Sequence, residues 1–363
     1  MKQVQKDFPV AQNYTYVNTA ASGLLSEDML DYRQEQDLDF LIGGSIYREK
    51  QVSFFNNVRK SVANFFDGKA TNVSLVPNFS WGMNALIEGL KPTEKVLLLD
   101  VDYPSINWSV ESRGLKVVTL PITANLEEVI LEKVKEEKPT VFAFSIVQFI
   151  NGVKIDLAFI KKLKAEFPEL LLIADGTQYF GTEPFSFKDS GIDVIGASAY
   201  KWMLGGYGCG FFMFTDAVMS RFDVKTTGMA SADGNMEATD ISLVRKLDPG
   251  HLDMFNFGSM QFGLEYLTDL NLTDISDYLT GLSVKAYKGF KELGLLDDAV
   301  ENRPNQLSTI FSLKLEEKYL GVLREQSIIA SYRANRLRVS FHIYNTEKDV
   351  NKLLLALRKI LNN

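Results

Sequence analysis

Short apolar runs alternate with amphipathic segments through the first two thirds of this sequence, and this alternation limits the possible folds more than any other feature. The apolar runs cover residues 73–76, 96–99, 117–120, 141–146, 170–174 and 194–197. Helical periodicity separates most of them, notably over residues 125–137 and 156–167. The pattern predicts an α/β fold whose largely parallel sheet is flanked by helices, and such sheets bind ligands at the carboxyl ends of their strands.

The length of the chain predicts more than one domain, because 363 residues exceed the usual size of a single hydrophobic core. The rhythm changes in the last third, where two helical patterns, two strand patterns and a final helix follow one another at 257–267, 273–292, 309–313, 337–341 and after Thr346. We therefore expect a large domain over residues 18–256 and a smaller C-terminal α+β domain over 257–363. Residues 1–17 are expected to form an arm that packs with the small domain.

Composition excludes several classes of protein. A formal charge of −7 without clustered Lys and Arg argues against binding to nucleic acid or to an anionic membrane. One cysteine forbids an internal disulfide, and the two distant histidines, His251 and His342, argue against a zinc centre. The first residues lack the apolar core of a signal peptide, and no apolar run is long enough to cross a bilayer, so we expect a cytoplasmic protein.

Two of the predicted strands end next to side chains that carry chemistry. The run 170–174 ends at Asp175, and the run 194–197 leads to Lys201. A carboxylate and an amine would therefore face one crevice at the edge of the sheet. A lysine that forms a Schiff base with pyridoxal phosphate (PLP), and an acidic group that keeps the pyridinium nitrogen protonated, are the two protein groups which that cofactor most needs.

The residues around this pair resemble the signature of class V aminotransferases. That family of fold-type I PLP enzymes includes cysteine desulfurases and isopenicillin-N-epimerase-like proteins, and the likeness covers the stretch from Asp175 to Gln178, the Ser-Ala-Tyr-Lys stretch ending at Lys201 and the glycine-rich turn 205–210. The resemblance implies that Lys201 forms the Schiff base, that Asp175 supports the ring nitrogen and that Gln178 bonds the phenolic oxygen of the ring. It also implies a seven-stranded, mostly parallel sheet in a large PLP-binding domain, and a homodimer with the active site at its interface.

A phosphate site is expected where the run 73–76 meets the next helix, over about 81–90. Backbone N–H groups and the helix dipole favour an anion there, and the Ser80 hydroxyl adds a donor. The family holds the PLP phosphate in a loop at this place, which implies roles for Ser80 and for its neighbour Trp81, although tryptophan departs from the family pattern. When this segment is considered alone, an ordinary N-capping loop is the favoured interpretation, and only its place in the series of motifs supports a phosphate site.

Four further residues are assigned to the phosphate by the resemblance. Ser198 and Tyr200 occupy positions whose side chains help to hold it, with tyrosine in place of the usual histidine. Gly250 and His251 stand where the family has a Gly-Thr pair that reaches the phosphate of the neighbouring subunit. A histidine beside Pro-Gly is otherwise a common surface-turn residue.

The remaining assignments concern the cofactor ring and the substrate. Tyr103 is the candidate for stacking on the ring, and a simple Tyr-Pro turn is the alternative. Gln148 resembles a position of the epimerase-like relatives and is expected to contact the cofactor or the substrate, and Asn18 lies in a segment that resembles a family loop at the mouth of the active site and is expected to border the substrate. Arg338 stands at the position of the family arginine that binds the substrate carboxylate, and its planar guanidinium can form two parallel hydrogen bonds with one. Its neighbour Arg336 is expected to be a charged side chain that faces the solvent.

The sequence also lacks a group that one branch of the family needs. Cysteine desulfurases carry a nucleophilic cysteine on a loop before the arginine strand, and residues 328–335 contain none. The single cysteine, Cys209, enters an apolar run and is expected to be a buried core residue. Persulfide chemistry is therefore disfavoured, and the glycine cluster is not a dinucleotide motif because it precedes a strand.

Transamination at the Cα of an amino acid is the first expectation, since it needs only the groups found. Epimerisation and elimination of a β-substituent would use the same residues. A PLP-binding protein without turnover, and an unrelated α/β protein in which Lys201 and Asp175 form an ordinary ion pair, remain open at this point.

Overall fold

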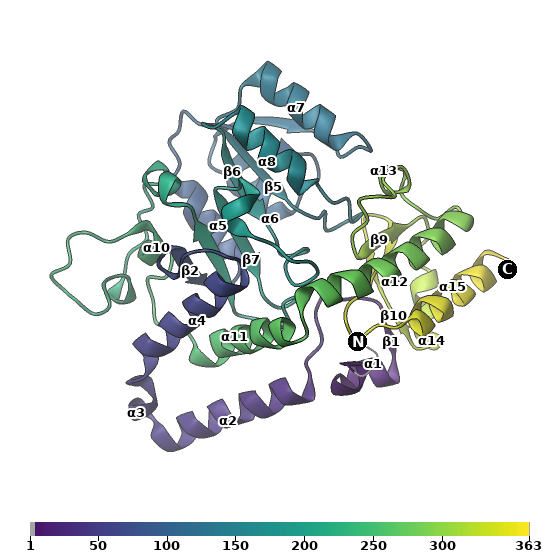
Figure 1. Cartoon of the computed structure of the whole chain (residues 1–363), viewed down its shortest axis with the longest axis horizontal. Helices are drawn as coiled ribbons and strands as arrows, with labels where there is room; N and C mark the ends of the chain where they lie inside the picture. The colour runs from purple at the N-terminus through teal and green to yellow at the C-terminus, as the bar shows by residue number, and fades with distance from the viewer. Residues whose placement is uncertain (1–3, 363) are drawn as a thin grey trace.

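A seven-stranded sheet forms the centre of the computed structural model, which describes residues 4–362 (Figure 1). Its strands lie in the order β2-β8-β7-β6-β5-β3-β4. They are β2 (Val73–Val76), β3 (Lys95–Leu99), β4 (Lys116–Leu120), β5 (Val141–Ser145), β6 (Leu171–Asp175), β7 (Val194–Ser198) and β8 (Gly210–Phe214). Only β8 runs against its neighbours, so the mostly parallel sheet expected from the sequence is confirmed.

Helices cover both faces of this sheet, and alternate residues of each strand supply the two cores. Leu97 and Phe142 point into the larger core, whereas Leu98 and Ala143 point into the second one. The helices of the large unit are α4 (Gln51–Phe65), α5 (Phe79–Glu88), α6 (Pro104–Glu111), α7 (Leu126–Glu137), α8 (Leu157–Glu166) and α9 (Phe187–Ser190). Strands buried on both faces need continuous apolar runs, which is why these strands could be recognised in the sequence.

Helix α5 begins two residues earlier than the sequence predicted. Asn78 is its N-cap, and the Asn78 Oδ1 atom accepts a hydrogen bond from the Trp81 N–H (2.9 Å). The capping residue lies directly after the Pro77 turn, so Phe79 and Ser80 already belong to the first helical turn. This places the Ser80 hydroxyl at the positive end of the helix dipole.

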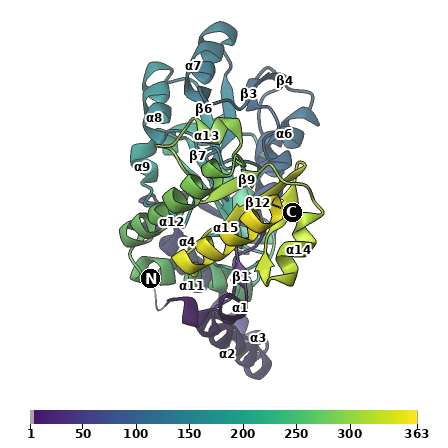
Figure 2. The same ribbon diagram turned by 90° about the vertical axis from the view of Figure 1, so that its right-hand side faces the viewer.

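A second, antiparallel sheet lies beside the large one, with order β11-β12-β9. Its strands are β9 (Ile310–Leu313), β11 (Ser331–Arg333) and β12 (Arg336–Ser340). Helix α12 (Leu272–Glu292) packs against α15 (Glu347–Leu361) on this unit, as Figure 2 shows. The two strands predicted at 309–313 and 337–341 correspond to β9, which begins one residue later than predicted, and to β12, which is displaced by one residue.

The N-terminal segment joins this smaller unit. Strand β1 (Thr15–Tyr16) pairs in parallel with β10 (Ile328–Ile329), and Asn18 bridges to Ser340 of β12. Residues 1–3 of the predicted arm lie outside the described residues. The boundary predicted after residue 256 falls inside α11 (Met254–Asp269), which packs against α4 and α2 (Glu27–Gly43), so that division of the chain stays a prediction.

The remaining elements are short and connect the larger ones. They are η1 (Val4–Asp7), α1 (Pro9–Asn13), α3 (Ser45–Arg48), η2 (Ala70–Asn72), η3 (Asp216–Arg221), η4 (Met229–Ala232), α10 (Leu243–Lys246), α13 (Asp298–Glu301) and α14 (Tyr319–Glu325). Helix α2 is capped by Ser26, whose Oγ accepts a hydrogen bond from the Met29 N–H (3.2 Å), as the sequence predicted. Together α2 and α3 project from the body of the molecule (Figure 1).

Candidate active site

Lys201 and Asp175 lie at the carboxyl ends of two neighbouring strands. Asp175 is the last residue of β6 and pairs in register with Gly196 of β7, and Lys201 follows β7 in the chain. Both side chains are buried, with relative exposures of 5% and 6%. The Lys201 amine lies 5.9 Å from the ring centre of Tyr103 and 5.4 Å from that of Tyr200. Within residues 4–362 this amine makes no hydrogen bond and no ion pair, so it is available to a ligand.

Burial and mutual attraction set the charge of this pair. Burial lowers the pKa of the Lys201 amine, and the Asp175 carboxylate partly opposes that effect. Burial likewise raises the pKa of Asp175, against hydrogen bonds from Thr177 and the positive charge of Lys201. A lysine with a depressed pKa has a neutral, nucleophilic fraction near pH 7, and such shifts mark functional sites.

The lowered pKa of Lys201 is directly measurable. In the cofactor-free protein, carbon-13 NMR of the lysine Cε atoms should show one resonance that titrates below the ordinary lysine value and disappears in a Lys201→Arg variant. Asp175→Asn should lower this pKa further, because it removes the charge that opposes burial. A Lys201 resonance that titrates together with the exposed lysines would contradict the electrostatic account.

The carboxylate of Asp175 is oriented by its own chain two residues on. The Thr177 N–H donates to Asp175 Oδ1 (2.8 Å), and Thr177 Oγ1 accepts a hydrogen bond from the Ser198 N–H (3.1 Å). Thr177 therefore connects the end of β6 to the end of β7. No role for Thr177 was predicted, although an Asp side chain at the end of a strand commonly accepts a hydrogen bond from the backbone N–H two residues on.

The side-chain amide of Gln178 already makes two hydrogen bonds within the protein. Gln178 Nε2 donates to the Ala20 carbonyl (3.0 Å), and Gln178 Oε1 accepts from the Trp202 indole N–H (2.8 Å). A side-chain amide has two N–H donors, so one remains for a ligand. The predicted hydrogen bond to the phenolic oxygen of the cofactor needs one donor and fits this arrangement.

Asp102 is a site residue that the sequence analysis missed. Its carboxylate accepts hydrogen bonds from the Ser145 N–H (2.9 Å), the Ser145 hydroxyl (2.6 Å) and the Tyr103 N–H (2.6 Å). Burial raises the pKa of Asp102, and hydrogen bonds from Ser145, Tyr103 and the Gln148 side chain partly oppose this effect. Asp102 thus fixes Tyr103, whose ring meets Phe149 edge-on at 5.4 Å. The available signal was a carboxylate just past strand 96–99, as Asp175 is just past 170–174.

The candidate phosphate site joins the starts of two helices. Ser80 in the first turn of α5 and Ser105 in the first turn of α6 approach each other, with their hydroxyl oxygens 2.6 Å apart. Ser198 Oγ accepts from the Phe79 N–H (2.9 Å), which leaves the Ser198 O–H free to donate. The backbone N–H of Trp81 is taken by the Asn78 cap, so its ring is the part of Trp81 left for a ligand. Ser105 was not predicted, although it follows Pro104 at a helix start.

Tyr200 lies beside Lys201 and presents a phenol in place of the family histidine. Its ring stacks on that of Tyr207 at 4.5 Å with an interplanar angle of 17°. Burial raises the pKa of Tyr200, so the phenol stays protonated and can donate a hydrogen bond. The predicted contact between Tyr200 and a phosphate remains a prediction.

Arg338 reaches the site from the small sheet. It is 3% exposed, and one of its terminal N–H groups donates to the Phe149 carbonyl (2.6 Å). Arg338 Nε has no hydrogen-bond partner among the residues that the structure describes. Burial, followed by the charge of Arg333, lowers the pKa of Arg338 to about 10. The buried Arg338 guanidinium would be stabilised by an anion, which agrees with the predicted contact to the substrate carboxylate.

The N-terminal segment 18–23 connects the small sheet with the chain around Lys201. The Ala20 N–H donates to Ser340 Oγ (2.9 Å), and the Gly23 N–H donates to the Tyr200 carbonyl (2.9 Å). A Cβ atom on Gly23 would lie 2.2 Å from the Lys201 carbonyl oxygen, so glycine is required for this close approach. Asn18, predicted to border the substrate, has a buried Oδ1 with no partner within the described chain.

Comparison with known proteins places this geometry in a family. The family described as "Aminotransferase class-V" matches residues 43–353 of the chain. The chain belongs to the class V aminotransferases. The PLP cofactor and the activity on amino acids expected from the sequence are therefore confirmed at the level of the family.

Relatives of this class V aminotransferase match over nearly its full length. It is 20% identical to the uncharacterized aminotransferase YcbU of Bacillus subtilis, covering 96% of this chain and 95% of that one. It is 22% identical to a probable cysteine desulfurase of Haemophilus influenzae, covering 99% and 90% of the two chains. Two solved structures share the fold. One is a C-DES mutant with glycine covalently linked to its PLP cofactor (TM-score 0.87, 18% identity, covering 97% and 98% of the two chains), and the other is the apo cysteine desulfurase of Thermococcus onnurineus (TM-score 0.86, 17% identity, 99% and 98%).

The residues of this class V aminotransferase fit PLP. The Lys201 amine and one N–H of Gln178 have no partner within residues 4–362 and match what the cofactor needs. In the Ser80–Ser105 pair one hydroxyl donates to the other, so one O–H is left for a ligand. Asp175 lies within electrostatic reach of Lys201. Bound PLP supplies an electron sink for the pair left when a bond at the substrate Cα breaks.

Gly250 and His251 lie apart from Lys201 within this chain. They line a depression with Arg48, Met229 and Arg245, of about 270 Å³. His251 Nε2 is 2.8 Å from a terminal nitrogen of Arg48. The structure of one chain therefore does not bring them to the phosphate site, and their predicted role requires a second subunit.

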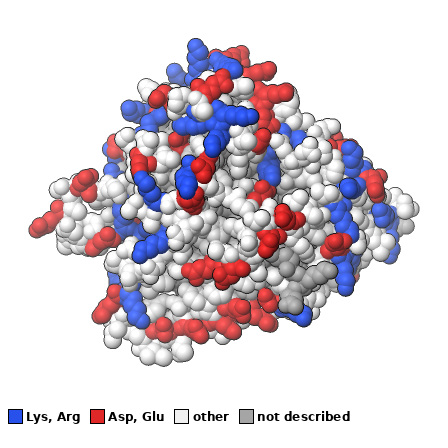
Figure 3. All heavy atoms as spheres, viewed as in Figure 1, with Lys and Arg blue, Asp and Glu red and all other residues white. Residues whose placement is uncertain are grey.

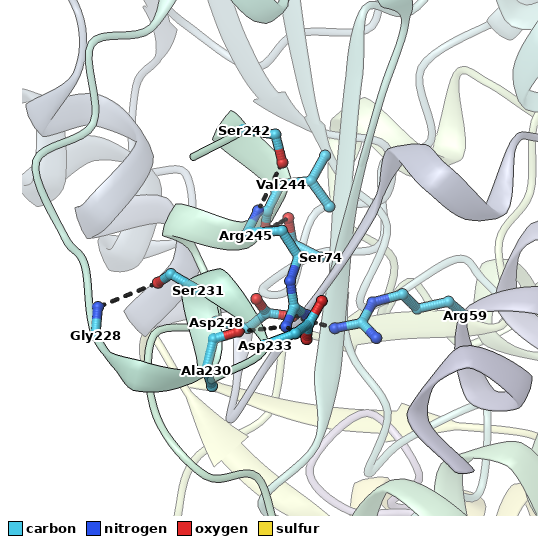
Figure 4. Close-up of polar contacts among 10 residues, drawn as sticks. All are labelled: Arg59, Ser74, Gly228, Ala230, Ser231, Asp233, Ser242, Val244, Arg245 and Asp248. Carbon is cyan, nitrogen blue, oxygen red and sulfur yellow. Dashed lines mark hydrogen bonds and ion pairs between the residues drawn. The ribbon is translucent and has the colours of Figure 1, made fainter. Parts of the chain in front are cut away.

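A buried ion-pair cluster holds the segment that carries these two residues (Figure 4). Asp248 pairs with Arg59 of α4 and with Arg245 (3.0 Å), and Arg245 also binds the Ala230 carbonyl and Asp233. Burial raises the pKa of Asp248 to about 6, against the pull of the two arginines. Breaking a buried pair leaves an uncompensated charge, so the cluster fixes the position of the following turn.

Proposed function

We propose that this enzyme transfers the amino group of an α-amino acid to a keto acid. The observation that carries the proposal is the buried, unpartnered amine of Lys201, which lies 5.9 Å and 5.4 Å from the ring centres of Tyr103 and Tyr200 and within electrostatic reach of Asp175 and Arg338. Arg338 would hold the substrate carboxylate, which orients the Cα–H bond. Lys201 Nζ is the nearest base, and it would take the proton from Cα and return it to the cofactor side.

The position of Cys209 supports transamination over persulfide chemistry. Its thiol is buried, and Sγ lies 3.4 Å from the Gly205 carbonyl oxygen. Burial also raises the pKa of this thiol to about 12, so the nucleophilic thiolate is suppressed. The chain has no other cysteine, and the hairpin formed by β11 and β12 carries arginines and serines where a desulfurase needs a thiol.

A panel of amino acids tests the proposal. Each amino acid is mixed with the PLP-loaded enzyme and a keto acid, and formation of the new keto acid and the new amino acid is followed by chromatography. Stoichiometric exchange of the amino group is the expected result. Exchange of the Cα proton with D₂O without keto acid would instead indicate epimerisation, and release of ammonia with pyruvate would indicate elimination. A panel without any response would leave a non-catalytic PLP-binding protein.

The proposal includes a homodimer, supported by an apolar surface at the tip of the α2–α3 projection. We call this surface the α2–α3 tip; it consists of the exposed side chains of Leu38, Phe40, Leu41, Ile42 and Ile46. Acidic residues lie along α2 at the lower edge of the molecule in Figure 3, and Asp37 and Asp39 flank Leu38. His251 lies near this projection through Arg48, so a second copy at the tip is the means by which it could reach a neighbouring site.

Replacing apolar side chains of the α2–α3 tip with charged ones should dissociate the dimer. Leu41→Asp with Ile42→Asp is expected to convert a dimer into a monomer by light scattering at micromolar concentration, because two charges would enter an apolar interface. Leu355→Asp, an exposed leucine of α15, is the matched control and should leave the dimer intact. A wild-type monomer, or a double variant that stays dimeric, would contradict this assembly.

A cytoplasmic location also belongs to the proposal. It is supported by the single cysteine, which the structure shows as a free, buried thiol and which suits a reducing compartment. Separately, none of the helices between residues 4 and 362 has the length and hydropathy to cross a bilayer. Fractionation of cells that express the tagged chain would test the location.

A further inference from the structure

The hairpin of β11 and β12 carries a row of polar side chains on one face. Ser331 lies opposite Arg338, and Arg333 lies opposite Arg336. Residues opposite each other in an antiparallel pair project from the same face, so these four side chains share a face. Because Arg338 reaches the Phe149 carbonyl beside the active site, the same face directs Arg333 toward that side.

The two neighbouring arginines differ in how their charge is compensated. Arg336 lies 3.9 Å from the Asp297 carboxylate, which offsets its charge. Arg333 is exposed, and its side chain donates to the carbonyl of Tyr332 (2.9 Å). Arg333 makes no ion pair with any residue of the described chain. The hairpin therefore carries, besides the buried Arg338, a second guanidinium that has no carboxylate partner within the described residues.

The positive charge of Arg333 affects the pKa values of two active-site residues. It is one of the charges that lower the pKa of Lys201, and it is the first cause after burial for the lowered pKa of Arg338. Two like charges beside a buried amine are unfavourable unless anions offset them. One substrate carboxylate at Arg338 offsets one of the two arginines and leaves the other.

Unpartnered donors accompany these arginines. In the small sheet, Arg338 is flanked in register by Ser331 of β11 and by Ser312 of β9. The hydroxyl oxygens of both serines and Arg338 Nε are buried without a hydrogen-bond partner in the part of the chain that the structure describes. Buried polar groups normally have a hydrogen-bond partner, so the two serine hydroxyls and Arg338 Nε together could donate to a ligand with several acceptor atoms.

We propose that the substrate is an α-amino acid with a second carboxylate on its side chain, and that Arg333 binds this distal carboxylate while Arg338 binds the α-carboxylate. This inference rests on the proposed function, since it names the substrate class of the same site. Arg333 acts as a specificity-determining residue, because its guanidinium forms a stronger, charge-assisted pair with a carboxylate than with the uncharged amide of glutamine or asparagine. The enzyme would therefore prefer acidic amino acids over their amides.

Kinetics on matched substrates test the assignment of Arg333. With the PLP-loaded enzyme, kcat/KM is measured for glutamate against glutamine and for aspartate against asparagine. Arg333→Gln should lower kcat/KM for the acids about 10- to 100-fold and leave the amides within about 3-fold, as expected for one charged hydrogen bond. Arg336→Gln is the matched control, because Asp297 compensates its charge, and should leave the ratio of acid to amide unchanged.

A binding measurement separates this inference from the proposed function. Calorimetry with the PLP-loaded protein compares glutarate, which has two carboxylates, with butyrate, which has one, so no turnover is needed. Glutarate should bind more tightly, and Arg333→Gln should remove most of that advantage. Equal binding of the two acids by the wild-type protein, or an equal loss in the Arg333 and Arg336 variants, would overturn the assignment even if transamination is found. Preferred glutarate binding without any turnover would support Arg333 and contradict the proposed activity.

Discussion

A Lys201→Ala variant is expected to lose its covalent link to PLP and to turn over amino acids at least about 10³-fold more slowly than the wild-type protein. The variant removes both the amine that holds the cofactor and the base nearest to the substrate Cα. Its stability should not fall greatly, because the buried amine has no hydrogen-bond or ion-pair partner among residues 4–362. Absorbance of the bound cofactor and single-turnover assays measure the two losses separately.

The control for Lys201→Ala is Lys60→Ala, which removes an exposed lysine of α4. The control should keep the cofactor link and the wild-type rate. A Lys201→Ala protein that retains covalently bound cofactor through several rounds of dialysis would contradict the assignment of the anchoring amine.

An Asp175→Asn variant is expected to bind PLP but to lose activity by about 10² to 10³-fold, the size of effect seen when one preorganised electrostatic group is removed. Asparagine keeps the oxygen that accepts from the Thr177 N–H, so the local backbone should be preserved. It cannot carry the negative charge that keeps the pyridine nitrogen of the cofactor protonated. The expected result is a folded variant that binds PLP but turns over its substrate slowly.

Asp100→Asn is the matched control for that variant. Asp100 is an exposed carboxylate that directly follows β3, as Asp175 ends β6, and its replacement should not change the rate. Thermal unfolding should report similar stability for Asp175→Asn and the wild-type protein. Full activity in Asp175→Asn would show that the carboxylate is an ordinary structural group.

Part of this site could be predicted from sequence because it depends on local patterns. The apolar runs before Asp175 and Lys201 are continuous, which marks strands buried on both faces, and parallel strands bring their carboxyl ends to one edge. The structure places the two residues there. The reversed direction of β8 was beyond such reasoning, because a continuous apolar run does not encode the direction of a strand.

Contacts between distant parts of the chain could not be predicted. Asp102 holds Ser145 across 43 residues, and the pairing of Ser80 with Ser105 joins the starts of two helices. No periodicity in the sequence links such pairs. The hairpin of β11 and β12 was missed for another reason, since Ala334 and Asn335 both adopt left-handed backbone angles (φ 48° and 60°) without the glycine that usually signals such a turn.

The account depends most on which amine holds the cofactor. Borohydride reduction of the PLP-loaded protein fixes the cofactor to that amine, and mass spectrometry of the proteolytic peptides then identifies the modified lysine. We expect the pyridoxyl group on the peptide that contains Lys201 and on no other. Modification of a different lysine, with Lys201 recovered unmodified, would contradict the account.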